Sequence, residues 1–221
     1  MSFLKGLNSL LFPKDNICFF CNEKEPKIVG YICTDCMKKL EYLNREVKLI
    51  DSYLDKVIYS LFYNRFIKEQ IYAYKYYSKN YLYKPLGEIL LDTIKEKSLV
   101  SEIDIITYVP LHRRRKALRG YDQSELIGRY ISKKLKIPFA KGNLIRKRST
   151  KSQTKLNKNQ RIKNLENAFY VKDSKEFLNK KVLLIDDIIT TGSTMEECGR
   201  ALIEKGAGEV IGLAITSGMK A

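Results

Sequence analysis

Residues 182 to 194 of the chain read Val182-Leu183-Leu184-Ile185-Asp186-Asp187-Ile188-Ile189-Thr190-Thr191-Gly192-Ser193-Thr194. The apolar run 182–185 predicts a buried β-strand that ends at two adjacent carboxylates, and a helix is expected over 193–205. Backbone N–H groups at such a helix start bind phosphate, and carboxylates at a strand end accept hydrogen bonds from sugar hydroxyls. The pattern therefore indicates a phosphorylated-sugar site, in which Gly192 lets the backbone approach the phosphate closely. A simple magnesium site or a helix cap is the plainer alternative for the two acids.

The surrounding sequence alternates strands and helices. Further strands are expected at 103–109, 168–171 and 210–215, and a further helix at 124–135. Strands separated by helices imply right-handed crossovers and a parallel sheet. We therefore expect an α/β fold with a Rossmann-like parallel sheet.

Four of the five cysteines lie in the first forty residues, as Cys18-Phe-Phe-Cys21 and Cys33-Thr-Asp-Cys36. Two CxxC pairs at this spacing let four thiolates converge on one zinc ion. Because a four-sulfur site has no open position for water, a structural zinc in a small N-terminal module is expected. Unrelated buried cysteines or a redox pair are the alternatives. Cys198 stands apart and is expected to be a small core residue.

The excess of positive charge is confined to one segment. Lys and Arg outnumber Asp and Glu by 41 to 25 in the whole chain and by 18 to 2 in residues 111–164, whereas the two flanks nearly balance. A clustered excess favours a polyanion partner, bound with an affinity that falls as salt rises. The alternative is a solvated, lysine-rich surface.

Residues 53 to 83 are dense in tyrosine, at positions 53, 59, 63, 72, 74, 76, 77, 81 and 83. These rings, interleaved with lysine and arginine, could stack on the bases of a single strand. Core packing is the alternative for any one of them, since a half-buried tyrosine keeps its hydroxyl wet. Helical segments with one buried face are predicted by the spacing of Ile58, Leu61, Phe62, Phe66, Ile67 and Ile71.

The N-terminal sequence predicts a soluble, cytoplasmic protein. No stretch approaches the ~18–20 apolar residues of a membrane span, and the first residues lack the features of a secretory signal. Phe3, Leu4, Leu7, Leu10 and Leu11 recur at helical spacing. A short amphipathic helix is expected there, packed beside the zinc module or touching a membrane.

The stretch 182–194 resembles the phosphoribosyl-diphosphate signature of type I phosphoribosyltransferases. Other segments are similar to the ComF family, bacterial competence proteins that join a four-cysteine zinc module to a phosphoribosyltransferase-like domain. The matching residues are Leu11-Phe12-Pro13, Val109-Pro110-Leu111-His112-Arg113-Arg114-Arg115, Arg119-Gly120-Tyr121-Asp122-Gln123-Ser124, Thr150, Gln153, Leu156, Arg161, Asn164 and Ala168-Phe169. The resemblance covers nearly the whole chain and implies a sheet of the type I phosphoribosyltransferase kind.

The resemblance also implies roles for individual residues. Asp186 and Asp187 would bind the ribose hydroxyls, and Thr190, Thr191, Gly192, Ser193 and Thr194 the 5-phosphate. Leu111, His112 and Arg113 would face pyrophosphate, and Mg²⁺ would enter with phosphoribosyl diphosphate or a related phosphosugar. Asp122 stands where many relatives have asparagine. His112, the one histidine, is either a general acid or a residue that shapes its loop.

The function implied is that of a cytoplasmic competence protein that binds incoming single-stranded DNA during natural transformation, with a competence helicase and a recombination mediator as partners. The DNA path is expected at Arg113, Arg114, Arg115, Arg119, Arg146, Lys147, Arg148, Lys151, Lys155 and Arg161. The alternative is an active phosphoribosyltransferase, a glycosyltransferase, acting on an unidentified small acceptor.

Three parts of the chain are expected. Residues 1–45 hold the N-terminal helix and the zinc module, residues 46–100 a tyrosine-rich helical segment packed on the core, and residues 101–221 the phosphoribosyltransferase-like domain. That domain includes a flexible basic loop at 146–163, a polar interruption of the strand and helix pattern.

Overall fold

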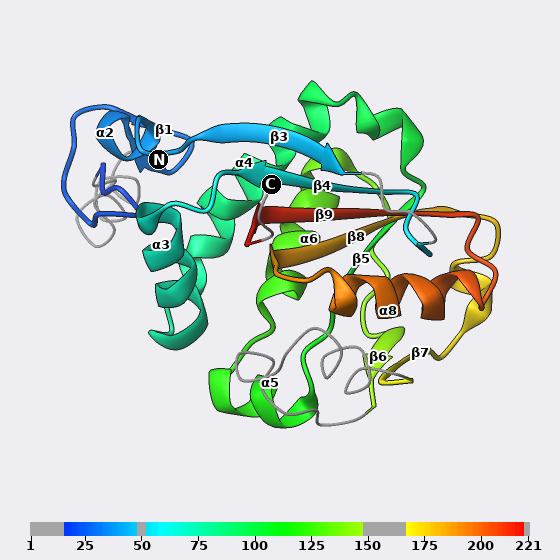
Figure 1. Cartoon of the computed structure of the whole chain (residues 1–221). Helices are drawn as coiled ribbons and strands as arrows, with labels where there is room; N and C mark the ends of the chain where they lie inside the picture. Colours follow the sequence, from blue (N-terminus) through cyan, green and yellow to red (C-terminus); the bar gives the residue numbers. More distant parts are fainter. Residues whose placement is uncertain (1–15, 48–51, 148–166, 219–221) are drawn as a thin grey trace, which may run out of the picture. The chain divides into compact units, whose positions relative to one another are not determined.

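The computed structural model describes residues 16–47, 52–147 and 167–218 (Figure 1). The chain divides into two compact units, an N-terminal unit, Met1–Lys39, and a main unit, Leu40–Ala221. The helix expected near residues 3–11 and most of the expected basic loop lie outside the described residues.

The N-terminal unit is built around its cysteines. Strands β1 (Ile28–Val29) and β2 (Ile32–Cys33) pair antiparallel, and the short helix α2 (Thr34–Met37) follows directly. Phe20 and Ile32 are buried beside Cys18, Cys33 and Cys36, and few other apolar side chains of the described part of this unit are. A unit with so small an apolar core needs a further cross-link, such as a bound metal ion, to remain folded.

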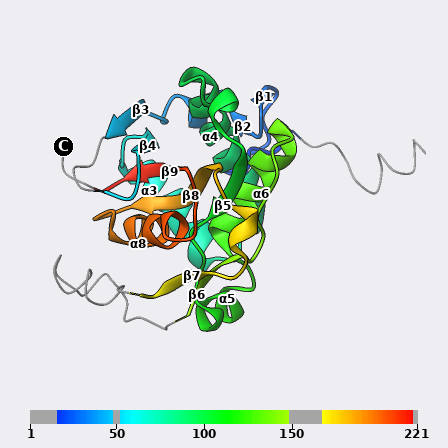
Figure 2. The ribbon, with the colours of Figure 1, turned by 90° about the vertical axis from the view of Figure 1, so that its right-hand side faces the viewer.

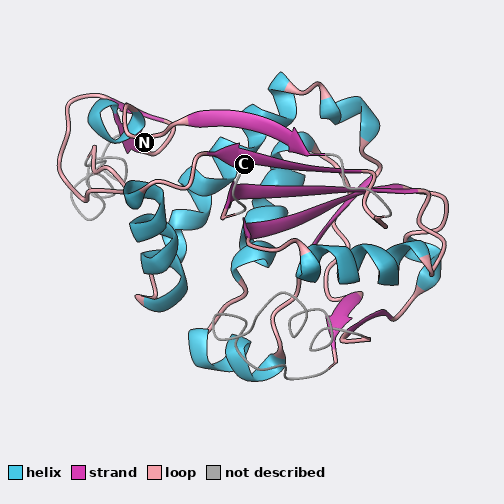
Figure 3. Ribbon diagram, viewed as in Figure 1, coloured by secondary structure: helices cyan, strands magenta, loops and turns pink. Residues whose placement is uncertain are grey.

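The main unit contains a five-stranded sheet with the order β3-β4-β9-β8-β5 (Figures 1 and 3). Its strands are β3 (Tyr42–Val47), β4 (Lys56–Leu61), β5 (Ile105–Tyr108), β8 (Lys181–Ile189) and β9 (Glu209–Ser217). Strands β4, β9, β8 and β5 run parallel, and β3 pairs antiparallel with β4 at one edge. The expected α/β fold with a parallel sheet is confirmed.

Helices cover both faces of this sheet. The α-helices are α3 (Arg65–Tyr76), α4 (Tyr83–Glu96), α5 (Arg113–Arg119), α6 (Gln123–Leu135) and α8 (Ser193–Ile203), and the short 3₁₀ helices are η1 (Asn80–Leu82), η2 (Leu99–Glu102) and η4 (Ser174–Glu176). Helices α4 and α6 pack together on one face, and α8 covers the other (Figure 2). Helices α3, α5 and α8 each follow the carboxyl end of a parallel strand, so their connections leave the same edge of the sheet.

The core lies between β8, β9 and the helices on either side. All four residues of the apolar run 182–185 are fully buried, as a central strand covered on both faces requires. Gly212 of β9 contributes by having no side chain, because a Cβ atom there would overlap the sulfur of Met195. Helix α8 can therefore approach the sheet closely at the point where the helix begins.

Two segments differ from the sequence prediction. Residues 56–61, expected to be helical, form β4, because a short apolar run that is buried on both faces has no periodicity that separates strand from helix. The tyrosine-rich segment is helical from Arg65 onward. Residues 42–47 form the edge strand β3, so the N-terminal unit ends at Lys39 rather than at residue 45.

The main unit also contains a two-stranded sheet, which lies beside α8. Strand β6 (Leu144–Arg146) pairs antiparallel with β7 (Phe169–Val171), so Arg146, expected at the start of a loop, ends a strand. Within the described ranges, no helix has the length and apolar character that crossing a bilayer requires.

Candidate functional site

Asp186 and Asp187 lie within β8 and point to different partners. The strand extends past both acids because it continues to pair with β9 as far as Ile189 and Ser217. Asp186 Oδ1 accepts hydrogen bonds from Ser124 Oγ at 3.1 Å and from the Asp187 backbone N–H at 2.8 Å. Burial, reinforced by the neighbouring Asp187 carboxylate, raises the pKa of Asp186 to about 7.

Asp187 pairs with a lysine that the sequence analysis did not identify. Lys75 Nζ of α3 lies 2.8 Å from Asp187 Oδ1, with side chains only 20% and 11% exposed. A sequence signal does exist, because Lys75 follows the buried Ile71 by four residues and so falls on the buried face of its helix. A lysine on an apolar helix face needs a partner, and here the partner is a site carboxylate.

Residues 190–194 follow β8, and we call them the phosphate loop because the sequence predicts that they bind the 5-phosphate. Gly192 adopts a left-handed conformation, with a φ of 76°, directly before α8. Thr191 Oγ1 and Ser193 Oγ lie 2.9 Å apart within the loop. The first N–H groups of a helix have no acceptor within the helix, and they carry the positive end of its dipole. The residues predicted to bind the 5-phosphate therefore lie at a helix start, a position that favours anions.

A cavity of about 430 Å³ opens beside this loop. From β8 and the phosphate loop it is lined by Asp186, Ile188, Ile189, Thr190, Gly192, Thr194 and Met195, and from the tyrosine-rich segment by Tyr63, Lys68, Ile71, Tyr72, Lys75 and Tyr76, with Gly218 completing the wall. The sequence analysis treated these two segments separately, and the fold brings them together. We call this space the donor cavity, after the phosphoribosyl diphosphate that the sequence resemblance predicts as its ligand.

The loop after β5 is held by Asp122. The Leu111 backbone N–H donates to Asp122 Oδ2 at 2.8 Å, and the Glu125 N–H donates to Oδ1 at 3.4 Å, so Asp122 also caps α6. Burial raises the pKa of Asp122 to about 6. Strands β5 and β8 are adjacent and parallel, so this loop and the phosphate loop leave the same edge of the sheet.

His112 caps the next helix. Its Nδ1 accepts the backbone N–H of Arg114 at 3.3 Å, at the start of α5. Partial burial and the guanidinium groups of Arg146, Arg114, Arg115 and Arg113 lower the pKa of His112, which disfavours the imidazolium form that could not accept this hydrogen bond. This arrangement agrees with a residue that shapes its loop.

The basic residues expected along DNA differ in exposure. Arg113 and Arg114 are exposed on α5, and Lys147 is exposed after β6. Arg115 and Arg119 are half-buried and line a second cavity, of about 380 Å³, together with Lys75, Tyr76, Ser78 and Leu118. Arg146 is only 7% exposed, and its guanidinium lies 5.2 Å from the centre of the Phe169 ring. Arg148, Lys151, Lys155 and Arg161 lie outside the described residues.

The four N-terminal cysteines form one cluster. The Sγ atoms of Cys18, Cys21, Cys33 and Cys36 all lie within 4.8 Å of one another, and those of Cys21 and Cys33 are 3.9 Å apart. Sulfurs at tetrahedral corners around zinc lie about 3.8 Å apart, given a Zn–S bond of about 2.3 Å, so the cluster is compatible with a zinc site. Burial opposes ionisation of Cys18, but backbone N–H groups of Cys21, Cys33 and Phe20 outweigh it and lower the pKa of the thiol to about 7. Cys198 is buried in the main unit, as expected.

Comparison with protein families finds a known domain in the C-terminal half of the chain, which includes the β8 side of the donor cavity. The sequence model of the phosphoribosyl transferase domain matches residues 122–218. This range contains α6, β8, the phosphate loop, α8 and β9. The fold is therefore the α/β fold of phosphoribosyl transferase domains, as the stretch 182–194 indicated.

Two relatives align with almost the entire chain. Competence protein F of Haemophilus influenzae is 30% identical over 210 residues, which are 91% of this chain and 90% of that protein. Competence protein ComFC of Bacillus subtilis is 29% identical over 205 residues, 89% of this chain and 82% of that protein. The DNA utilization protein YhgH of Escherichia coli is 35% identical over 107 residues, 48% of this chain and 46% of that protein.

Proposed function

The chain belongs to the ComF family of competence proteins, and we propose that it binds both phosphoribosyl diphosphate and the single-stranded DNA that enters during natural transformation. The observation that carries the first part is the convergence of Asp186 with Thr190, Gly192 and Thr194 on one cavity. The relatives' names, competence and DNA utilization, support the second part.

In this proposal each part of the donor cavity binds one part of phosphoribosyl diphosphate, which we call the donor. Residues 190–194 hold the 5-phosphate through backbone N–H groups and hydroxyls. Asp186 and Asp187 accept hydrogen bonds from the ribose hydroxyls, and the loop at Leu111, His112 and Arg113 faces the diphosphate. Mg²⁺ enters with the donor, where it neutralises diphosphate charge and bridges its oxygens.

Lys75 prepares the site for this ligand. Its ammonium lies 2.8 Å from Asp187 Oδ1 and holds that side chain in place as an acceptor for a ribose hydroxyl. Ser124 does the same for Asp186 by a neutral hydrogen bond, which fixes the orientation of the carboxylate. The positions of both acceptors are thus set before the donor arrives.

The remaining parts of the proposal follow from the family. A structural Zn²⁺ bound by Cys18, Cys21, Cys33 and Cys36 stabilises the N-terminal unit, and its chemistry suits the compact sulfur cluster. The protein acts in the cytoplasm, with a competence helicase and a recombination mediator as partners in handling the strand. The clustered positive charge of residues 111–164 supports a nucleic-acid partner.

Isothermal titration calorimetry with the donor and Mg²⁺ tests the site. We expect saturable binding to the wild-type protein and a loss of about a hundredfold or more in the Asp186→Asn/Asp187→Asn variant, since each charge-assisted hydrogen bond contributes about 1.5–3 kcal/mol. Asp104→Asn is the matched control, because Asp104 is exposed at the opposite end of the sheet, beside Lys181. Unchanged affinity in the double variant, or no binding to the wild type, would contradict the proposal.

A second candidate function is phosphoribosyl transfer to a small acceptor. The observation in its favour is that the donor cavity extends from the phosphate loop to the side chains of Tyr63 and Tyr72, which gives an aromatic wall beside the ribose position. In such a reaction the acceptor forms a bond to the ribose anomeric carbon and pyrophosphate leaves. Pyrophosphate release that depends on an added acceptor would support turnover. If no acceptor makes the release faster than it is in buffer without protein, the protein binds the donor but does not transfer its phosphoribosyl group.

A further inference from the structure

Three tyrosine rings gather on the exposed part of α3 and just after it. Tyr72, Tyr76 and Tyr77 are 51%, 58% and 66% exposed. The Tyr72 ring centre lies 4.7 Å from that of Tyr76 and 5.5 Å from that of Tyr77. Core packing does not explain these rings, because the buried tyrosine of this helix is Tyr74, whose hydroxyl donates to the Gln123 carbonyl. A contiguous exposed aromatic cluster of this kind indicates an interaction surface.

Cationic side chains lie next to the Tyr76 ring of the aromatic cluster. The Arg119 guanidinium of α5 lies 5.0 Å from the centre of the Tyr76 ring. The second cavity, of about 380 Å³, places Lys75, Arg115 and Arg119 next to the same ring. No acidic side chain is among the described residues that line this cavity. Because Lys75 is paired with Asp187, Arg115 and Arg119 give this recess its positive charge, directly beside the Tyr76 ring.

Helix α5 extends the positive surface. Its sequence, Arg-Arg-Arg-Lys-Ala-Leu-Arg, contains no acid, and none of its side chains, all of which are described, is buried. Leu118, at 87% exposure, leaves an apolar contact among the cations. Alternating cationic and apolar contacts fit a polymer that carries regularly spaced phosphates and flat bases.

We propose that α3 and α5 form a stacking surface for single-stranded DNA, which we call the α3–α5 platform. Successive bases stack on Tyr72 and Tyr76, and the phosphates between them lie in the second cavity against Arg115 and Arg119. The inference rests on the proposed DNA-binding function and gives it a location on these two helices, whereas the sequence analysis expected a path that included the basic loop at 146–163.

The arrangement of the tyrosine rings favours single-stranded DNA over duplex DNA. Tyr72 and Tyr76 are four residues apart on one helix, so their rings stand on the same face and can meet neighbouring bases of one strand. Bases in a duplex are already stacked and paired, so they cannot reach these rings, whereas duplex phosphates can still reach Arg115 and Arg119. The platform therefore contributes to single-strand affinity through its rings and to affinity for either form through its charge.

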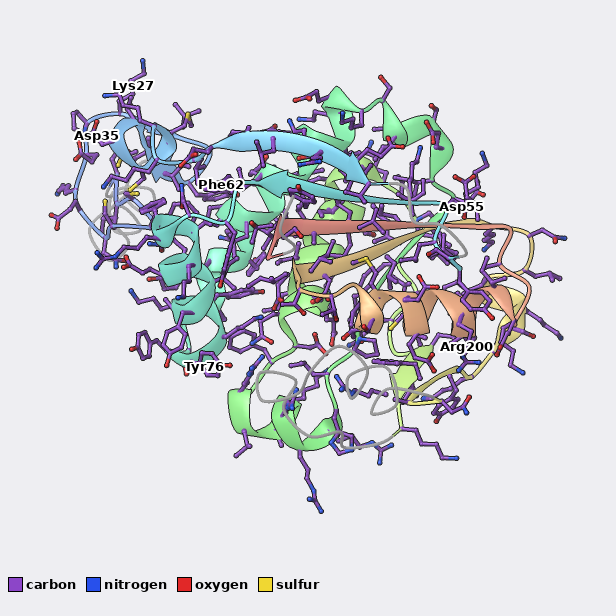
Figure 4. The ribbon with its side chains drawn as sticks, viewed as in Figure 1. Lys27, Asp35, Asp55, Phe62, Tyr76 and Arg200 are labelled. Carbon is purple, nitrogen blue, oxygen red and sulfur yellow. The ribbon has the colours of Figure 1, made fainter. Side chains whose placement is uncertain are left out.

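Fluorescence anisotropy with labelled oligothymidylate tests the rings. We expect Tyr72→Ala/Tyr76→Ala to weaken binding by about tenfold or more, because base stacking is worth ~1–3 kcal/mol per ring, and Tyr76→Phe to bind as the wild type does. Tyr53→Ala is the matched control, since Tyr53 is 44% exposed and precedes Asp55 by two residues. Figure 4 shows Asp55 at the far end of the sheet from Tyr76. An oligonucleotide of abasic sites keeps the phosphates and lacks the bases, so the tyrosine variants should bind it as well as the wild type does.

Reversing the charge of Arg115 and Arg119 tests whether the second cavity binds phosphates. Arg115→Glu/Arg119→Glu should weaken binding and lower the slope of log affinity against log salt by about 1.4, roughly 0.7 for each lost contact to a phosphate of a single strand. Lys172→Glu/Lys175→Glu changes the net charge equally at exposed positions of the segment after β7 and should leave the slope nearly unchanged. A tyrosine variant should lose affinity at every salt concentration without a change of slope.

The outcomes separate this inference from the proposed function. No binding of single strands by the wild type would overturn both. Binding by the wild type that persists unchanged in the tyrosine and arginine variants would overturn the platform and leave DNA binding intact. If a variant does not fold, photocrosslinking of bromodeoxyuridine-substituted DNA to the wild type decides the matter: crosslinks at Tyr72 or Tyr76 support the platform, and crosslinks confined to other segments overturn it.

Discussion

Asp186 and Asp187 are adjacent in sequence and differ in what holds them. Asp186 has neutral hydrogen-bond donors, the Ser124 hydroxyl and a backbone N–H, whereas Asp187 has the Lys75 ammonium. Two carboxylates side by side in a poorly solvated place repel each other, and a single cation relieves the repulsion at the one it contacts. Burial and the neighbouring carboxylate thus leave Asp186 with a raised pKa, whereas Asp187 forms an ion pair.

Replacing Asp186 tests this difference through its pH dependence. The pKa of Asp186 is raised to about 7 in the folded chain, against about 3.9 when unfolded, so the folded state loses stability as pH rises between these values. Asn cannot ionise, so Asp186→Asn should match the wild type near pH 4 and exceed its free energy of unfolding by about 1–3 kcal/mol at pH 8. Urea unfolding at both pH values measures the difference, and a difference that does not depend on pH would contradict the assignment.

Replacing Lys75 tests the ion pair. Lys75→Met leaves the Asp187 carboxylate without its cation, and we expect a loss of about 1–3 kcal/mol in the free energy of unfolding at pH 7. Adding Asp187→Asn to this variant should cost nothing further or recover part of the loss, because the orphaned charge is removed. Lys68→Met, at an exposed position of the same helix, is the control. Additive losses in the double variant would show that the two side chains are not coupled.

At the scale of elements, the sequence predicts well where periodicity and turn chemistry agree. Strand β8 and helix α8 follow directly from an apolar run, two acids and a loop of threonine and glycine. Strand β4 could not be distinguished from a helix, because its burial on both faces removes the alternation that reveals a strand. The contribution of α3 to the donor cavity was also not predictable, since it depends on which strand ends lie side by side in the sheet.

Alanine substitution at two glycines, one inside the phosphate loop and one outside it, tests whether this loop binds the donor. Gly192 and Gly142 have φ values of 76° and 67°, and an added Cβ would contact nothing within 4 Å at either position. Either alanine substitution should therefore cost about 1–2 kcal/mol of stability, from backbone strain alone. Only Gly192→Ala alters the loop at the start of α8, so it alone should weaken donor binding, by about tenfold, in calorimetry. Equal donor affinities in the two variants would argue against a phosphate cradle at this loop.

At the scale of the whole molecule, two compact units are stabilised by different means. The main unit has a continuous apolar core around β8 and β9, whereas the N-terminal unit is organised by four sulfurs. The cysteine spacing predicted this cluster because ligand geometry is a local property of the chain. The end of the N-terminal unit at Lys39 was less predictable, since it depends on residues 42–47 joining a sheet formed by distant parts of the sequence.

Removing one zinc ligand tests whether a bound metal stabilises the N-terminal unit. We expect about one zinc ion per chain in the wild type, as four thiolates complete one tetrahedral site, and markedly less in Cys18→Ser. The variant should expose residues 16–39 to trypsin while the main unit keeps its unfolding temperature. Cys198→Ser is the control, because Cys198 is buried in the main unit and should leave the zinc content unchanged. A metal-free Cys18→Ser protein that resists trypsin as the wild type does would contradict a structural zinc.

The donor cavity and the α3–α5 platform meet at Lys75 and Tyr76, which line both cavities. A bound donor brings its negative charge next to Lys75 and Tyr76, beside the cavity in which Arg115 and Arg119 hold the DNA phosphates, so the two ligands should oppose each other.

The most direct test is to measure the affinity for labelled single-stranded DNA at one ionic strength with and without saturating donor and Mg²⁺. The account predicts that the donor weakens DNA binding by the wild type and has no effect on the Asp186→Asn/Asp187→Asn variant. DNA affinity that is unchanged while calorimetry shows the donor bound would contradict the shared site.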